Sequence, residues 1–174
     1  NLTQVVVSTD GTRPIFTGIL FEIKEGRLNF VSSDTHRLCH TYLEKIDTNV
    51  DKWESIIPAK SLKEVAFIIN EDEEVGVHIT SNRILFQSRN IKVVSRLIEG
   101  KFVNYEQVIP KEFTTEANIM KKTLLDSLER AFVLTRDELK TKMNTVKLNL
   151  KETMMILSSK ASEIGDIYEE IPLM

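Results

Sequence analysis

A two-residue turn at Glu25-Gly26 is the feature that most constrains how this chain can fold. It joins two strand-like runs, residues 19–23 and 27–31, within a predicted hairpin over residues 15–33. Because loop length selects the register of a hairpin, the turn predicts which side chains share a face of the sheet. One face carries the pairs Ile23–Leu28 and Phe21–Phe30, and the other carries Leu20–Val31, Gly18–Ser33 and Phe16–Thr35. The first face has more apolar bulk and should cover a core, so we expect a functional site on the second.

Two further hairpins have the same form, with turns at Ser81-Asn82 and Glu152-Thr153. They predict the pairs Ile79–Ile84, Val77–Phe86, Leu150–Met155 and Leu148–Leu157. Apolar residues at helical spacing predict helices over residues 58–69 and 123–136, and the tail of another over residues 2–6. The apolar stripe of the last helix comprises Leu124, Leu125, Leu128, Ala131 and Phe132.

Additional strands are expected over residues 36–43, 91–98 and 164–171, and near Phe113. The chain therefore repeats a unit of one helix, one hairpin and one more strand. Such units pack helices on one face of antiparallel sheets and leave the other face to water or a partner. The predicted fold class is α+β.

Composition narrows the classes of function. A net charge of −3 over 174 residues argues against a simple electrostatic nucleic-acid binder. Cys39 is the only cysteine, which excludes an internal disulfide framework and indicates a reducing, cytoplasmic setting. No apolar run approaches the roughly 18 residues of a membrane span. The chain starts at Asn1 without a leader, so we expect an internal piece of a longer protein.

Several separated motifs carry a family resemblance. They are RPIFTGILFE at residues 13–22, SDTHRL at 33–38, IPAK at 57–60, and LIEGKF at 97–102 followed by Asn104-Tyr105 and VIP at 108–110. In order and spacing this set resembles the bacterial sliding clamp, the beta subunit of the replicative DNA polymerase. The resemblance implies a DNA-clamp fold, with repeated helix-plus-sheet units and helices on one face of curved sheets. Residues 1–110 would be most of the middle domain, and residues 111–174 the first half of the third.

The resemblance also implies a function. Clamps are non-catalytic processivity factors without a cofactor, and the full-length homodimer forms a ring around double-stranded DNA. A pocket in the middle domain binds short peptides of the polymerase catalytic subunit, the clamp loader and repair proteins. Carried over by motif, it comprises Phe16, Gly18, Ser33, Thr35, His36, Arg37, Leu38, Val103, Gln107 and Val108. Thr35 stands where the family usually has glycine, and Val103 where it often has proline.

Basic residues on the helices have two interpretations. From the residues alone they are solvated helix faces, whereas clamp helices line the DNA-filled hole of the ring. The resemblance thus implies a DNA-facing set of Arg13, Lys60, Lys63, Lys121, Lys122 and Arg130. Attraction to phosphates without base contacts suits a protein that slides. Residues 71–74 should form a solvated acidic loop.

Three alternatives to the clamp remain for parts of the sequence. The first is an antiparallel peptide-binding module with no DNA role. The second is a hydrolase built on Ser33, Asp34 and His36, but strand alternation directs Ser33 away from the other two. The third is a metal site at Asp34, His36 and His40, which lacks an identifiable further ligand.

Overall fold

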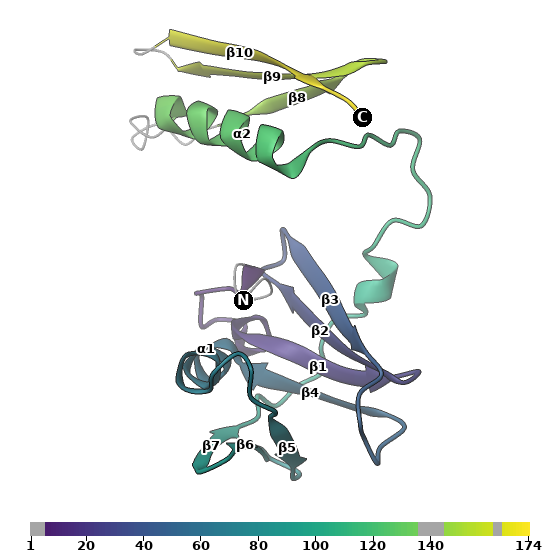
Figure 1. The fold of residues 1–174 in the computed structure, drawn as a ribbon, viewed down its shortest axis with the longest axis vertical. Coiled ribbons are helices and arrows are strands. Elements are labelled where there is room, and N and C mark those ends of the chain that lie inside the picture. Colours follow the sequence, from purple (N-terminus) through teal and green to yellow (C-terminus); the bar gives the residue numbers. More distant parts are fainter. Residues whose placement is uncertain (1–5, 136–144, 162–164) are drawn as a thin grey trace. The chain divides into compact units, whose positions relative to one another are not determined.

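The computed structural model describes residues 6–135, 145–161 and 165–174 (Figure 1). The chain divides into two compact units, Asn1–Ile109 and Pro110–Met174. Most of the helix tail predicted over residues 2–6 lies outside the described residues. Within the described residues no helix is long and apolar enough to cross a membrane.

The first unit is built on a four-stranded antiparallel sheet of order β3-β2-β1-β4. Its strands are β1 (Gly18–Lys24), β2 (Arg27–Ser33), β3 (Leu38–Glu44) and β4 (Trp53–Pro58). The register of β1 on β2 confirms the predicted pairs Ile23–Leu28, Phe21–Phe30 and Leu20–Val31. Both turn residues, Glu25 and Gly26, have positive φ angles of 53° and 73°. A type I′ turn requires that conformation at both central positions, which explains why this short turn fixed the register.

The predicted pairing of Phe16 with Thr35 is wrong. Residues Pro14–Thr17 form a 3-10 helix, η2, and β1 begins only at Gly18. Pro14 occupies the first turn of η2, where its fixed φ angle suits a helix and its missing N–H group removes a ladder donor. Phe16 therefore reaches the sheet from a helical turn rather than from a strand.

Both faces of β1 are buried, so the expectation of an open second face is also wrong. Besides the face predicted to cover the core, Leu20 and Val31 are buried on the opposite face. There they form a second cluster with Phe16, Ile56, Phe102 and Tyr105. Phe102 and Tyr105 come from the connector between the two units, residues 101–110, which includes the short 3-10 helix η3 (Tyr105–Gln107). The connector thus covers the face that the strand pattern left open.

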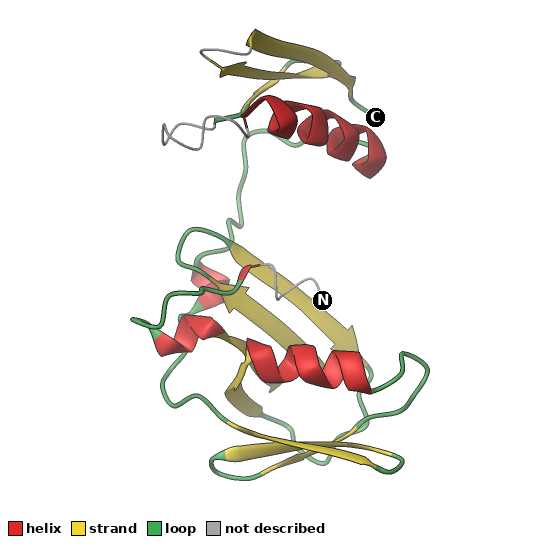
Figure 2. Cartoon of the chain, turned by 90° about the vertical axis from the view of Figure 1, so that its left-hand side faces the viewer, coloured by secondary structure: helices red, strands yellow, loops and turns green. Residues whose placement is uncertain are grey.

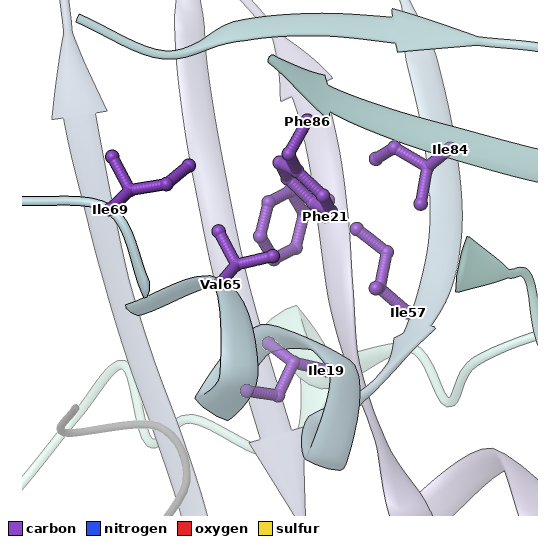
Figure 3. Packing of buried hydrophobic residues seen from close by; sticks show 7 residues of the cluster. All are labelled: Ile19, Phe21, Ile57, Val65, Ile69, Ile84 and Phe86. Carbon is purple, nitrogen blue, oxygen red and sulfur yellow. The ribbon is translucent and has the colours of Figure 1, made fainter. Parts of the chain in front are cut away.

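The larger core lies between this sheet, helix α1 (Ala59–Ile68) and a second sheet of order β5-β6-β7. The second sheet comprises β5 (Gly76–Ile79), β6 (Arg83–Ser88) and β7 (Ile91–Arg96), and its register confirms Ile79–Ile84 and Val77–Phe86. Figure 3 shows Val65 and Ile69, from α1 and its C-terminal end, beside residues of both sheets. The members of this cluster are Ile19, Phe21, Ile57, Val65, Ile69, Ile84 and Phe86.

The second unit packs helix α2 (Lys121–Thr135) on a sheet of order β10-β9-β8, as Figure 1 shows. The strands are β8 (Lys147–Leu150), β9 (Met154–Ala161) and β10 (Gly165–Pro172). The pairs Leu150–Met155 and Leu148–Leu157 are confirmed. The strand predicted near Phe113 is absent, and that side chain is exposed. From the predicted stripe of α2, Leu125 and Phe132 are exposed, because the sheet covers only the side of the helix that carries Leu124, Leu128 and Ala131.

Candidate functional site

The turn between β2 and β3 is held by its own side chains. The Ser33 hydroxyl donates to the Arg37 carbonyl at 2.8 Å and accepts from the Thr35 N–H at 3.2 Å. The Asp34 carboxylate accepts from the backbone N–H groups of His36 and Arg37 at 3.0 and 2.8 Å. It also accepts from Nε and Nη2 of Arg37 at 3.0 and 2.7 Å. These bonds fix a turn that leaves His36 and Arg37 exposed.

Thr35 has a φ angle of 78°, in the left-handed region that side chains with a branched Cβ rarely adopt. This geometry gives a physical reason for glycine at this position in a related chain. Threonine is held there by the hydrogen bonds of the turn around it.

The electrostatics of the turn do not support a hydrolase. Hydrogen bonds from Arg37 hold the pKa of Asp34 at about 2, so this carboxylate is charged and engaged by Arg37 at neutral pH. The Ser33 hydroxyl donates to a backbone carbonyl rather than to a base. Among the residues that the structure describes, no three His, Cys, Asp or Glu side chains lie close enough together to hold a metal ion.

Of the predicted apolar residues of the site, Phe16 and Leu38 meet in one cluster, whereas Val103 and Val108 are exposed. Phe16 is buried, and its ring meets the Phe102 ring edge to face at a centroid distance of 6.0 Å. Leu38 is partly buried and packs against the same cluster. Gly18 lies beneath them at the start of β1, where an added Cβ would be 2.6 Å from a methyl carbon of Ile56. The ring of Phe16 is thus largely covered by the protein itself.

The connector residues of the predicted site lie next to buried anchors. Val103, Gln107 and Val108 are exposed, whereas Phe102 and Tyr105 are buried in the cluster with Phe16. The Tyr105 hydroxyl donates to the Glu22 carboxylate at 2.6 Å, and Lys24 forms an ion pair with Glu106 at 2.6 Å. Both contacts tie η3 to β1 across more than 80 residues of sequence. Burial, reinforced by the Glu22 hydrogen bond, raises the pKa of Tyr105 well above its usual value, so the phenol remains a donor.

We expect Tyr105→Phe to lower the free energy of unfolding by about 1–3 kcal/mol, because it leaves the buried Glu22 carboxylate without this donor. Urea unfolding followed by circular dichroism measures the change. Tyr168→Phe is the matched control, since that side chain is exposed and its hydroxyl makes only a 3.4 Å bond to Glu170. Equal effects of the two substitutions would contradict an anchoring role for Tyr105.

A cavity of about 400 Å³ adjoins the turn. Its lining residues are Ser8, Asp10, Thr12, Arg13, Phe16, Asp34, Thr35 and His36. The pocket predicted from the sequence includes Phe16, Thr35 and His36. It does not include any residue of the loop over residues 8–13. Asp10 shapes that loop by accepting from the Thr12 N–H at 2.9 Å and the Thr12 hydroxyl at 2.8 Å. Arg13, which the resemblance places on the DNA-facing surface, is among the residues that line this cavity.

The other basic residues expected to face DNA differ in their partners. Lys60, Lys63 and Lys121 are exposed. Lys122 forms an ion pair with Asp126 at 2.9 Å. Arg130 donates to both oxygens of Glu169 at 2.6 Å, and this contact lowers the pKa of Glu169 to about 2.

The acidic loop over residues 71–74 is exposed at Glu71, Asp72 and Glu74, as expected, but not at Glu73. The Glu73 side chain is 7% exposed and forms an ion pair with Arg89 at 3.4 Å. It also accepts hydrogen bonds from Asn70 and Ser88, each at 2.8 Å. This carboxylate therefore closes the loop onto β6 rather than facing water.

Two family models match the chain in succession. The one described as DNA polymerase III beta subunit, central domain, matches residues 1–104, and the one described as its C-terminal domain matches residues 106–173. The sequence is 36% identical to a beta sliding clamp of Halalkalibacterium halodurans, over 97% of this chain and 45% of that protein. It is 34% identical to the beta sliding clamp of Streptococcus pneumoniae, over 98% of this chain and 45% of that protein.

Solved structures that resemble this chain belong to the same family. The DNA polymerase sliding clamp of Bacillus subtilis superposes with a TM-score of 0.91 at 32% identity, covering 98% of this chain and 45% of that chain. A DNA polymerase III beta chain of Streptococcus pneumoniae superposes with a TM-score of 0.88 at 34% identity, over 98% of this chain and 45% of that chain. The DNA-clamp fold predicted from the sequence is confirmed. The chain spans about 45% of the length of the relatives it matches.

Proposed function

Since this chain belongs to the DNA polymerase III beta subunit family, we propose that it is part of a DNA sliding clamp. The full-length protein would form a homodimeric ring around double-stranded DNA and hold the replicative polymerase there, with no catalysis of its own. The observation that carries this proposal is the succession of a central-domain and a C-terminal-domain match along one chain. Residues 1–110 would be most of the middle domain, and residues 111–174 the first half of the third.

Retention on circular DNA tests the ring. The protein expressed from the complete gene, loaded on nicked circular duplex by a clamp loader, should coelute with the DNA in gel filtration. Cutting the circle should release it, because a ring that slides leaves through an end. Loss of retention on cutting supports the clamp. Peptide binding with no retention on circular DNA would instead favour the interaction module without a DNA role.

The site around the β2–β3 turn would receive the short peptides of the polymerase catalytic subunit, the clamp loader and repair proteins. Three features support this proposal: the apolar cluster that contains Phe16 and Leu38, the exposed polar groups of His36 and Arg37, and the neighbouring cavity, whose lining includes Phe16 and Arg13. An apolar peptide side chain gains about 25 cal/mol for each Å² of apolar surface that it buries. The polar groups would then fix the orientation of the peptide.

For the DNA-facing surface we expect Lys60→Ala with Lys63→Ala to weaken binding of the full-length protein to duplex DNA. Binding is measured over a range of salt concentrations, since the logarithm of the binding constant falls linearly with the logarithm of the salt concentration. The magnitude of this slope should decrease by about 0.9 for each phosphate contact removed, hence by up to about 2 per subunit. Lys92→Ala, an exposed lysine on β7, is the control. A slope unchanged by the double substitution would remove α1 from the DNA-facing surface.

A further inference from the structure

Helix α1 exposes an aromatic ring among positive charges. Figure 2 shows α1 against the four-stranded sheet. Val65 lies on the packed side of the helix, within the core cluster. Successive residues of an α-helix turn by about 100°, so Phe67 lies on the side opposite to Val65, in the stripe that also carries Lys60 and Lys63. The Phe67 side chain is 87% exposed, the largest exposed fraction among the large apolar side chains that the structure describes.

Spacing brings the three side chains together on this face. Lys63 lies one turn before Phe67, and Lys60 lies one turn before Lys63, about 10 Å from Phe67 along the axis. Within the described residues neither lysine forms an ion pair. Glu64 lies in the same stripe and is exposed, one turn after Lys60 and one turn before Phe67. The face therefore carries two lysines, one glutamate and one flat apolar surface, with a net positive charge.

This combination selects among partners by charge and by shape. Two unpaired lysines beside the ring favour a polyanion over an apolar protein groove. Duplex DNA supplies phosphates, but its bases are stacked, and exposing one costs a few kcal/mol per step. Unpaired bases present free flat faces, and stacking on an aromatic side chain is worth about 1–3 kcal/mol per base.

We propose that the exposed face of α1 binds single-stranded DNA, with Phe67 stacking on a base and Lys60 and Lys63 contacting the adjacent phosphates. The inference rests on the proposed function only in taking α1 as a DNA-facing helix. It adds a preference for unpaired strand that phosphate attraction alone does not provide.

Binding to a fluorescein-labelled oligothymidylate and to a hairpin duplex of equal charge tests the preference, using the full-length protein at low salt. Phe67→Ala should weaken binding to the single strand about five- to 150-fold and binding to the duplex less than twofold. Phe67→Trp should retain single-strand affinity. Phe113→Ala removes another exposed phenylalanine and should change neither affinity.

Two outcomes would overturn the proposal: unchanged single-strand affinity in Phe67→Ala, or equal losses on both DNAs. In the first case, a lower melting temperature of Phe67→Ala would mean that the ring packs against another part of the protein. Failure of the clamp proposal is separate, since it appears as absent retention of the wild-type protein on circular DNA.

Discussion

Gly18→Val should lower the free energy of unfolding of the first unit by about 3 kcal/mol or more. A Cβ atom at this position would be 2.6 Å from Cγ2 of Ile56, 2.8 Å from the Ile57 carbonyl oxygen and 2.8 Å from Cδ1 of Ile98. The carbonyl oxygen belongs to β4, which pairs with β1 at this point, so the backbone itself must move. Overpacking of a tight interior commonly costs about 1–3 kcal/mol, and valine adds two methyl groups beyond the clashing Cβ.

The backbone of Gly18 is extended, with a φ angle of −117°, so the expected effect is steric and not conformational. Urea unfolding of Gly18→Ala and Gly18→Val should show a graded loss. Gly11→Ala is the control, since its added Cβ would meet no atom within 4 Å. A Gly18→Val midpoint equal to that of Gly11→Ala would mean that β1 and β4 separate easily here.

Arg37→Ala should weaken binding of a peptide with Leu-Phe-type side chains about ten- to a hundredfold. The Arg37 side chain is exposed beside the proposed site, and it also holds the Asp34 carboxylate within the turn. Removing it takes away a donor for the peptide and loosens the turn that positions His36 and Leu38. Arginine is prominent among the residues whose truncation costs binding energy at interfaces.

Isothermal titration of the full-length protein measures this loss, with His36→Ala as the second variant. Arg27→Ala is the matched control: it pairs with Glu44 and stacks on Tyr42 at the opposite end of the same strands. Phe16→Ala is unsuitable as a sole test, because truncating a buried phenylalanine costs about 3–5 kcal/mol of stability by itself. Unchanged affinity in both Arg37→Ala and His36→Ala would remove the site from the β2–β3 turn.

Hairpin registers were predictable from the sequence because they depend on local geometry. Turns at Glu25-Gly26, Ser81-Asn82 and Glu152-Thr153 each fixed a pairing that the structure has. The polar residues between Ser33 and Leu38 are close in sequence, and local hydrogen bonds hold them in one turn.

The errors arose where distant segments decide the structure. The second face of β1 looked open because Phe102 and Tyr105, which cover it, lie about 80 residues further along the chain. The loop over residues 8–13 carries no periodic signal, so its contribution to the cavity could not be read from spacing. The extended sequence near Phe113 resembled a strand, but no neighbouring strand pairs with it among the described residues.

Burial of β1 on both sides has a thermodynamic consequence. Ile19 and Phe21 belong to the core with α1 and β6, whereas Leu20 belongs to the cluster beneath the proposed peptide site. Alternate residues of a single strand thus couple two hydrophobic clusters, so neither should melt without the other. A ligand that stabilises the Phe16 side should therefore slow amide hydrogen exchange in β6, although it touches nothing there.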